Sequence, residues 1–311
     1  MSKKWKHIYG PVPSRRLGLS LGVDLVPYKT CNFDCIYCQL GRTRQKTIER
    51  KRYIEAGDIL DNLFGALENI TKPDFITLAG SGEPTLNSDI GLIIREIKKK
   101  TSIPLAVLTN GSLLTDDDVS EALTLADVIL PSLDASDEDT FQKINRPHES
   151  LHLETIVEGL VKFREKFTGA IWLEIFFVDG VNTSETSVEL FKKILERINP
   201  DKVQLNTAVR PPTESFVKAV SDSELRKICG KLGGICEVIV QREEIPRDAK
   251  NIVDPETIIA ILSRRPCTLV DLSKGLSASP NHILKTIAVL QKEGAIKSYF
   301  QNRELFYARA G

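Results

Sequence analysis

The sequence lacks a long hydrophobic run and a secretory leader, and each absence argues against a class of protein. No stretch of roughly 18–20 uncharged apolar residues is present, so no membrane-spanning helix is predicted. The first residues are basic but have no apolar run and no small-residue cleavage site, which predicts a cytoplasmic protein. With 41% hydrophobic and 27% charged residues, the composition favours a packed globular chain over a disordered, collagen-like or coiled-coil one.

The sequence also lacks net charge, because 42 basic residues balance 42 acidic ones. The distribution is uneven: residues 1–52 hold 12 Lys and Arg against 3 Asp and Glu. Such a basic segment could attract an anionic substrate or fold onto the acidic remainder of its own chain, and charge alone does not indicate nucleic-acid binding. Three arginines are candidates for a substrate phosphate or carboxylate, and equally for surface or ion-pair roles: Arg15, Arg16 and Arg210.

Histidine is scarce, and none of the four histidines lies in a nucleophile–base pattern, so His148 and His152 are expected to be ordinary helix or loop residues. Six cysteines are present, half of them widely spaced. The widely spaced ones are expected to be buried structural thiols rather than ligands of a second cluster. They are Cys229, Cys236 and Cys267.

The other three cysteines lie within eight residues, at Cys31, Cys35 and Cys38. In a long chain of intracellular character, such a cluster indicates metal binding or catalysis rather than a disulfide framework. Structural zinc normally takes four protein ligands, and no fourth cysteine or histidine lies nearby. Cuboidal iron–sulfur clusters also usually take four thiolates, so three cysteines would leave one iron without a protein ligand.

Residues from about 20 to 240 alternate short apolar runs with longer amphipathic stretches. Strands are predicted at Leu19–Val26, Phe75–Leu78, Leu105–Thr109, Val128–Leu130, Ala170–Val178 and Lys202–Leu205. Helices are predicted near 55–69, 88–100, 116–126, 137–165, 184–198 and 221–230, with start signals at Thr115 and Ser221. Six β–α units predict a parallel sheet with helices outside it, and the pattern fits an open sheet or a partial barrel.

Both architectures place ligands at the carboxyl ends of the strands. The polar and Gly-rich segments of this sequence follow the predicted strands, beginning with the cysteine loop. The others are residues 80–85, 109–111, 131–134, 179–182 and 206–210. Any one of them could be an ordinary turn, since Gly and Asn commonly end strands. Together with the cysteines, they favour a single shared site.

The last part of the chain has a different pattern. Helices are predicted at 255–263, 268–275 and 279–293, with Thr268 as a cap, followed by a hairpin from residues 294–300 and 304–307. Three helices and a hairpin resemble a winged helix-turn-helix. The predicted division is therefore a basic segment (1–19), the α/β domain (20–245), a linker (246–253) and a small domain (254–311).

The spacing Cys31-x3-Cys35-x2-Cys38 resembles the signature of the radical S-adenosylmethionine enzymes, and the resemblance covers roughly residues 10–240. The segments 10–16 and 27–31 are similar to a group called iron–sulfur oxidoreductases, which resembles the wybutosine-synthesis and molybdenum-cofactor cyclisation enzymes. The resemblance implies a partial (β/α)6 barrel with a small C-terminal winged helix-turn-helix domain. It does not imply a substrate.

The resemblance also implies site residues and cofactors. The three cysteines of the signature would hold a [4Fe–4S] cluster whose open iron chelates S-adenosylmethionine. Gly80, Gly82 and Glu83 stand where the family has Gly-Gly-Glu, with Ser81 as the departure, and would contact the methionyl ammonium. Contacts to adenine, ribose and carboxylate would come from Tyr37, Asn110, Ser132, Asp134 and Asn182.

The implied activity is reductive cleavage of S-adenosylmethionine to a 5′-deoxyadenosyl radical, which abstracts hydrogen from a peptide or protein, an RNA base or a cofactor precursor. A flavodoxin or ferredoxin would be the electron donor. Two other function classes stay open at this point. A redox-sensing regulator would bind DNA without cleaving S-adenosylmethionine, and a zinc structural protein would hold no iron.

The small domain has three readings. As a DNA reader it would face the major groove with Asn281, His282, Lys285 and Thr286. As a peptide-recognition domain it would pair a substrate leader with the edge strand near Lys297–Phe300. As a lid or dimer contact it would bind no ligand of its own.

Overall fold

The computed structural model describes residues 5–239, 255–276, 278–301 and 304–310, except for the side chains of Pro13 and Asn281. The predicted linker at 246–253 lies outside these residues. An eight-stranded sheet occupies the centre, in the order β1-β2-β5-β6-β7-β8-β9-β10. All neighbouring strands run parallel except β1 and β2. Their bounds are Ile8–Ser14, Gly18–Val23, Phe75–Leu78, Leu105–Thr109, Val128–Pro131, Ala170–Phe177, Lys202–Thr207 and Cys236–Val238.

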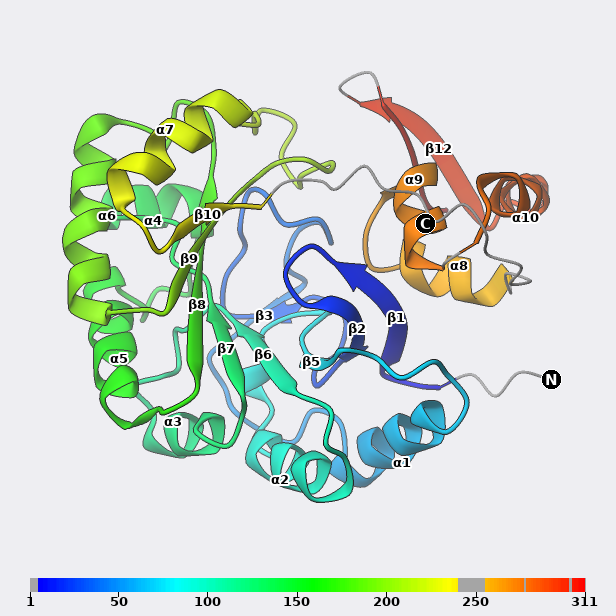
Figure 1. Cartoon of the computed structure of the whole chain (residues 1–311), viewed down its shortest axis with the longest axis horizontal. Helices are drawn as coiled ribbons and strands as arrows, with labels where there is room; N and C mark the ends of the chain where they lie inside the picture. Colours follow the sequence, from blue (N-terminus) through cyan, green and yellow to red (C-terminus); the bar gives the residue numbers. More distant parts are fainter. Residues whose placement is uncertain (1–4, 240–254, 277, 302–303, 311) are drawn as a thin grey trace.

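The six predicted parallel strands are confirmed, and β1 and β10 extend the sheet at its two edges. The sheet is curved, and helices α1 to α7 lie around its outer side, as a partial barrel requires (Figure 1). These helices span Ala56–Leu67, Ile90–Lys100, Asp117–Leu123, Glu138–Asn145, Leu153–Lys166, Glu185–Ile198 and Asp222–Leu232. One apolar core fills the space between sheet and helices, with Ile59, Ile94 and Phe163 among its fully buried members.

Two local predictions are wrong. The helix predicted at 137–165 is two helices, because Arg146 adopts a left-handed φ of 43° and Pro147 cannot continue a helix. Helix α3 is capped by Asp116 and not by Thr115: the Asp116 carboxylate accepts a hydrogen bond from the Val119 amide. The Ser221 start of α7 is confirmed, since the Ser221 hydroxyl accepts from the Glu224 amide.

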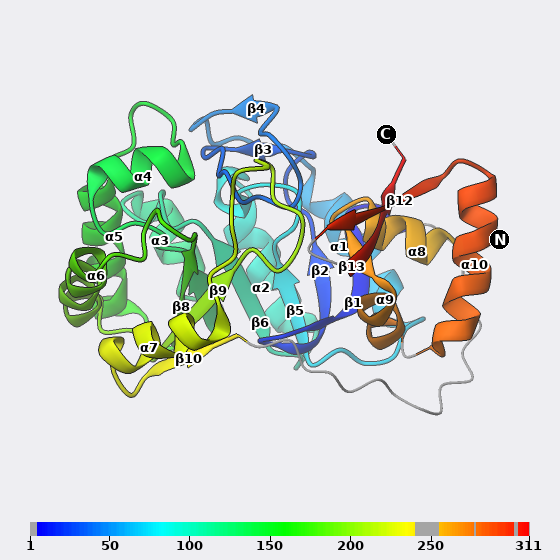
Figure 2. The ribbon, with the colours of Figure 1, turned by 90° about the horizontal axis from the view of Figure 1, so that it is seen from above.

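The C-terminal residues form three helices and a small antiparallel sheet, seen at the right of Figure 2. Helices α8, α9 and α10 span Pro255–Leu262, Leu269–Gly275 and Pro280–Lys292. Strands β11, β12 and β13 span Cys267–Thr268, Ile296–Gln301 and Glu304–Arg309, in the order β11-β13-β12. The predicted helices and hairpin are confirmed, and Thr268 caps α9 in a capping box with Asp271.

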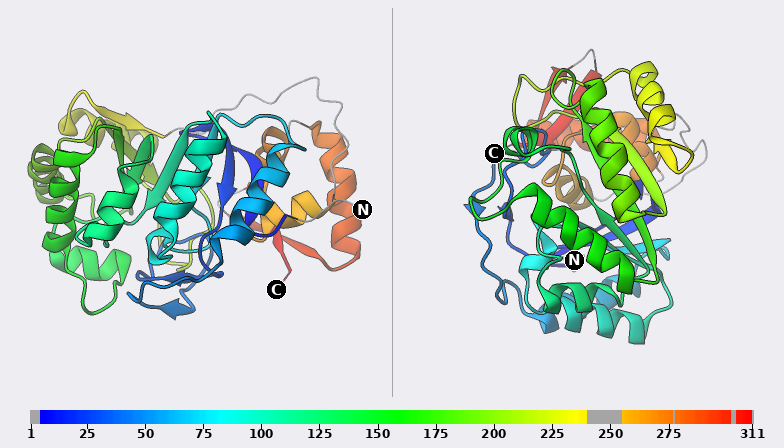
Figure 3. Two further views of the ribbon diagram at one scale, coloured as in Figure 1. Left: turned by 90° about the horizontal axis from the view of Figure 1, so that it is seen from below. Right: turned by 90° about the vertical axis from the view of Figure 1, so that its left-hand side faces the viewer.

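Strand β1 belongs to both parts of the molecule. It pairs with β2 at one edge of the large sheet, while α8 and α9 contact its other side (Figure 3). Val12 is buried in one cluster with Ile258, Ile261 and Leu272 of the C-terminal residues. The basic first segment is therefore not a separate tail: its strand is shared between the two cores.

No helix among the described residues is both long and apolar enough to cross a membrane.

Shortening the Val12 side chain tests this shared core. Val12→Ala removes two buried methyl groups, and we expect the free energy of unfolding to fall by on the order of 2 kcal/mol. Val270→Ala, at an exposed position of α9, is the matched control and should change stability by less than about 0.5 kcal/mol. Denaturant unfolding measures both, and equal effects would contradict a common core.

Candidate functional site

The cysteine loop is fixed to the end of helix α4. The first cysteine ends the short strand β3 (Thr30–Cys31), which pairs with β4 (Gln45–Lys46). Backbone amides of Asp34 and Ile36 donate to the carbonyls of Asn145 and Ile144, each over 2.9 Å. The last carbonyls of a helix have no partner within it, so the loop satisfies groups that α4 leaves free. The loop conformation therefore depends on where α4 ends.

Each of the three thiols accepts at least one hydrogen bond at sulfur. The Phe33 amide lies 3.5 Å from Cys31 Sγ, and the Asn145 side-chain amide lies 3.4 Å from Cys35 Sγ. Burial raises the pKa of Cys31 to about 12, and it raises the pKa of Cys35 well above its usual value. A bound metal cation would instead favour the deprotonated form of these cysteines, because the thiolate is the form that binds metal.

A buried lysine, which the sequence analysis missed, lies beside the third cysteine. Lys29 is 3% exposed, and its Nζ donates to Cys38 Sγ over 3.2 Å. An ammonium at this distance would offset part of the negative charge of a thiolate-bound cluster. The only sequence signal was its place two residues before Cys31, since nothing in composition or spacing marks a lysine as buried.

Within the described part of the chain, no three His, Cys, Asp or Glu side chains are arranged to hold a single metal ion. A cuboidal cluster sets a different requirement, because each thiolate binds its own iron. The residues present fit that requirement. Three thiols of one loop face a common neighbourhood, and the donor set is entirely sulfur with amide and ammonium donors around it.

The loop after β5 contains two glycines that no other residue could replace. A Cβ at Gly82 would lie 1.7 Å from the Thr30 carbonyl oxygen, and one at Gly80 would lie 1.9 Å from Asp24 Oδ1. The backbone must therefore pass against the cysteine loop and the end of β2. The close approach places the following residue, Glu83, between the ends of strands β5 and β6.

Glu83 is buried and held by four hydrogen bonds. Its Oε1 accepts from the amide and hydroxyl of Thr85 and from the Thr109 hydroxyl, and its Oε2 accepts from the Asn110 amide over 2.7 Å. Burial raises the pKa of Glu83, although these hydrogen bonds oppose the shift. Three of these hydrogen bonds fall on Oε1 and one on Oε2, so Oε2 can accept one more donor.

Asn110 and Ser132 lie at the ends of the next two strands. The Asn110 side-chain amide donates to Asn32 Oδ1 over 2.5 Å and approaches Cys31 Sγ at 3.9 Å. The Ser132 amide continues the sheet by donating to the Thr109 carbonyl over 3.0 Å. Asn110 is thus next to the cysteine loop, and Ser132 stands at the same edge of the sheet.

Tyr37, Asp134 and Asn182 form one buried unit with Phe176. The Tyr37 hydroxyl donates to Asp134, and the Tyr37 ring stacks on Phe176 with centroids 3.9 Å apart. Asn182 donates to the carbonyls of Asp134 and Phe176 and accepts from the Val178 amide. The Asn182 amide is therefore occupied in fixing the ends of β7 and β8. Burial raises the pKa of Asp134 against the pull of its hydrogen bonds.

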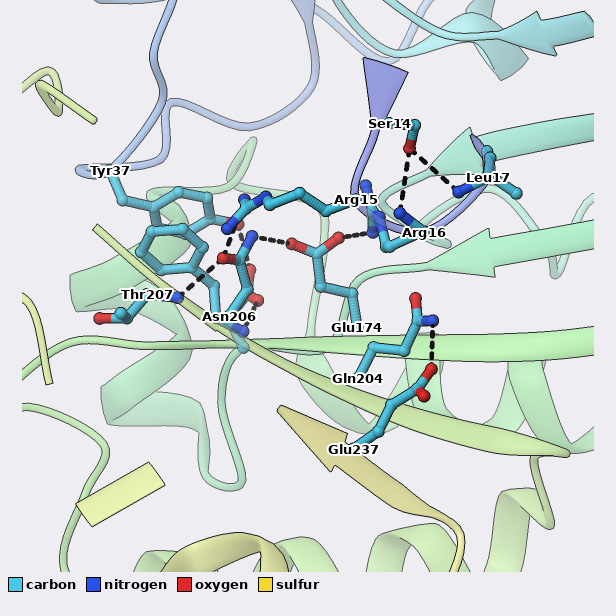
Figure 4. A network of polar contacts seen from close by, with 12 residues as sticks. Ser14, Arg15, Arg16, Leu17, Tyr37, Glu174, Gln204, Asn206, Thr207 and Glu237 are labelled. Atoms are coloured by element: carbon cyan, nitrogen blue, oxygen red, sulfur yellow. Dashed lines mark hydrogen bonds and ion pairs between the residues drawn. The ribbon is translucent and has the colours of Figure 1, made fainter. Parts of the chain in front are cut away.

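A cavity of about 350 Å³ opens between the cysteine loop and the interior of the sheet. Tyr37, Cys38 and Gly80 line one part of it. Across this cavity, the turn between β1 and β2 is joined to strands β8 and β9 by a chain of polar contacts (Figure 4). Arg15 donates to Asn206 over 3.2 Å, Asn206 donates to Glu174 over 2.9 Å, and Arg16 pairs with the other oxygen of Glu174.

Most of the predicted site residues meet at this end of the sheet. His152 is an exposed N-cap of α5. The His148 backbone amide donates to the Asn32 carbonyl of the cysteine loop over 2.8 Å, while its ring bonds to Ser150. Cys229 and Cys236 adjoin each other on α7 and β10, where burial, and then Cys229 itself, raises the pKa of Cys236. Cys267 is buried in the C-terminal core.

Removing the Asp134 carboxylate tests the buried unit. Asp134→Ala removes the carboxylate acceptor of three donors, namely the Tyr37 hydroxyl, the Asn145 side-chain amide and the Phe176 backbone amide. We expect a loss of about 3 kcal/mol or more in the free energy of unfolding. Glu196→Ala, on the exposed face of α6, should cost less than about 0.5 kcal/mol. Denaturant unfolding measures both variants. A loss in Asp134→Ala no greater than in the control would contradict the role of Asp134 as the shared acceptor of this unit.

Comparison with known proteins gives relatives along the whole chain. A UPF0026 protein of Helicobacter pylori strain J99 is 33% identical over 303 residues, which cover 94% of this chain and 96% of that one. A protein of Brachyspira hyodysenteriae named GTPase Obg is 37% identical over 308 residues, or 98% of this chain. This chain spans only 45% of the length of that relative.

Solved structures show the same fold. A radical SAM methyltransferase from Sphaerobacter thermophilus superposes with a TM-score of 0.56 at 18% identity, over 70% of this chain and 65% of that one. TYW1 with a lysine–pyruvate adduct bound gives a TM-score of 0.52 at 18% identity, over 72% of this chain and 75% of that one. The mixed α/β fold with a central parallel sheet is thus that of a radical SAM partial barrel.

The model of the radical SAM superfamily matches residues 25–192, which include the cysteine loop and strands β5, β6, β7 and β8. Enzymes of this superfamily use a [4Fe–4S] cluster and S-adenosylmethionine, and they generally need an electron donor. The chain belongs to the radical SAM superfamily and is an enzyme with these two cofactors.

Proposed function

We propose that Cys31, Cys35 and Cys38 hold the [4Fe–4S] cluster and that the reaction takes place in the cavity beside Cys38. The arrangement that carries the proposal is one loop with three thiols, each with an N–H donor at sulfur, in which Cys38 lines a cavity inside the sheet. When bound, the two cofactors supply a 5′-deoxyadenosyl radical that abstracts hydrogen from a substrate carbon. The protein's part is to bind, to orient and to exclude water.

S-adenosylmethionine would lie along the strand ends beside the cysteine loop. Oε2 of Glu83 has a free acceptor position for the methionyl ammonium, and Gly80 and Gly82 let the backbone come close. Tyr37 would lie by the adenine, held there by Asp134 and Phe176. Ser132, Asn110 and the Asp134–Asn182 pair complete the proposed contacts to ribose and carboxylate. Since its amide is fully occupied, Asn182 would act by positioning its neighbours.

For the C-terminal residues we propose a winged helix-turn-helix that forms a wall of the active site. Three helices and a three-stranded antiparallel sheet support the winged-helix assignment. The contacts with the barrel favour the lid-like reading over a free DNA or peptide reader. Arg264 pairs with Asp24 over 2.6 Å and lies over the Tyr9 ring, and Arg210 pairs with Asp271 over 3.1 Å.

A reader of nucleic acid or peptide would use surfaces that this packing leaves free. His282 and Lys285 on α10 are exposed, and the edge strand β12 carries Phe300 at 76% exposure. His282 and Lys285 do not line the cavity beside Cys38, so a DNA-binding regulator would need the cluster only as a distant sensor. Lys297, Ser298 and Tyr299 of β12 do line a second cavity together with Cys38. A small electron carrier of the flavodoxin or ferredoxin type is the proposed reductant, in the cytoplasm.

Loss of one thiol should abolish the cluster. After anaerobic reconstitution with iron and sulfide, Cys35→Ala should lose the visible absorption and form no 5′-deoxyadenosine with dithionite and S-adenosylmethionine, because two thiolates cannot hold the cluster. Cys229→Ser, on α7, should keep both. Full absorption in Cys35→Ala, or zinc in place of iron in the wild type, would contradict the assignment.

Loss of the Glu83 carboxylate should weaken the binding of S-adenosylmethionine and leave the [4Fe–4S] cluster in place. We expect Glu83→Ala to keep the cluster absorption and to bind S-adenosylmethionine at least about tenfold more weakly, because a charge-assisted hydrogen bond is lost. Glu96→Ala, a carboxylate on the outer helix α2, is the control. Anaerobic equilibrium dialysis measures the affinity. An unchanged affinity in Glu83→Ala would refute its role.

A further inference from the structure

A strongly basic cleft separates the barrel from the C-terminal residues. The inner cavity of about 350 Å³ is continuous with an outer one of about 970 Å³, since both are lined by Cys38, Gln39 and Arg264. Of the described residues, Glu174 is the one acidic residue that lines either cavity. The basic residues that line them are Arg15, Arg16, Arg44, Arg210, Arg264, Arg265, Lys297 and Arg309. A chain with no net charge thus concentrates positive charge at the proposed active site.

The five arginines of the inner cavity are only partly neutralised. Three of them pair with carboxylates, in Arg16–Glu174, Arg210–Asp271 and Arg264–Asp24. Arg15 is bonded to the neutral Asn206, and Arg265 has no ion pair among the described residues. Two positive charges therefore remain, one on the β1–β2 turn and one just after helix α8.

Several guanidinium N–H groups in this cluster are also left without an acceptor. Arg15 Nη1, Arg210 Nε and Arg264 Nε are buried and have no hydrogen-bond partner among the described residues. Leaving a charged donor buried and unpaired is unfavourable, because the group loses its hydrogen bonds to water and gains none in return. Burial, and then repulsion from Arg210 and Arg265, lowers the pKa of Arg15 to about 10. An anion between these side chains would relieve the unpaired donors and the repulsion together.

We propose that the inner cavity binds the phosphate group of a small phosphorylated substrate, with Arg15 and Arg265 as its principal ligands. A phosphate monoester carries a charge of about −2 near neutral pH, which matches the two unneutralised arginines. Its oxygens accept the paired N–H groups of guanidinium in a bidentate geometry that an ammonium cannot provide. This inference deepens the proposed function, on which it rests, by naming the class of substrate.

The cavity favours a small molecule over a polymer. Its volume lies within the range of roughly 300–1,000 Å³ that is usual for small-ligand sites. The unpaired donors belong to three arginines that line it, and of these three only Arg264 also lines the outer cavity, so the anionic group must enter between the barrel and the C-terminal residues. The position of Arg265 in that wall gives the small domain a direct part in substrate binding.

Binding of inorganic phosphate to the reconstituted holoenzyme tests the proposal, by isothermal titration calorimetry without reductant or S-adenosylmethionine. We expect Arg15→Gln and Arg265→Gln each to weaken phosphate binding at least about tenfold, the loss of one charge-assisted pair. The lysine variants at the same positions keep the charge and should lose less. Arg226→Gln, an exposed arginine on α7, should bind phosphate like the wild type. Circular dichroism checks that each variant is folded.

Three outcomes would overturn the proposal. They are no phosphate binding by the wild type, equal binding by folded Arg15→Gln and Arg265→Gln, and citrate binding as tightly as phosphate. A short single-stranded RNA that binds through Lys297 and Arg309 while phosphate does not bind would assign the cleft to a polymer. Because the measurement needs no radical chemistry, phosphate binding without 5′-deoxyadenosine formation would count against the proposed function alone.

Discussion

Three parts of the molecule meet on the buried carboxylate of Asp24, which follows the first parallel strand. One of its oxygens accepts from the Ser81 amide over 2.7 Å and so holds the Gly-rich loop after β5. The other pairs with Arg264, which lies just beyond helix α8 and over the Tyr9 ring of β1. A buried carboxylate must be paired, and its removal would leave both an amide and a guanidinium unsatisfied. The strand, the loop and the small domain therefore constrain one another.

The interior of the barrel could be predicted where a local pattern sufficed. Alternation of apolar runs with amphipathic stretches located six of the seven parallel strands of the large sheet, because most residues of these six strands are buried and apolar. Strand β1 was missed for the opposite reason. Its sequence, IYGPVPS, contains glycine and two prolines, and its residues pack partly against the C-terminal helices, which lie hundreds of residues away. The end of α4 was missed because one left-handed residue, Arg146, decides it.

The candidate site could also be predicted only where its signal is local in the sequence. The cysteine spacing is a local signal and pointed to the cluster chemistry of the superfamily that the chain belongs to. The groups that surround the sulfurs are not local, since Asn145 comes from α4 and Asn110 from the end of β6. Lys29 is near in sequence, but its burial depends on the fold: a left-handed φ of 62° and the bond from its amide to the Ser81 carbonyl fix its direction. The spacing of cysteines in a sequence indicates cluster ligands, but it does not indicate the groups that surround them in the fold.

Charge is the clearest case in which position in space outweighs composition. The basic opening segment had two readings, attraction of an anion or folding onto an acidic surface, and the structure divides its residues between them. Arg50 pairs with Asp116 and Arg52 with Asp89, the residues that precede helices α3 and α2. Arg15 and Arg16 instead turn into the cavity, where residues far along the chain add Arg210, Arg264 and Arg265. In a cavity of low dielectric, such charges interact far more strongly than exposed ones, so a chain with zero net charge can still select an anion.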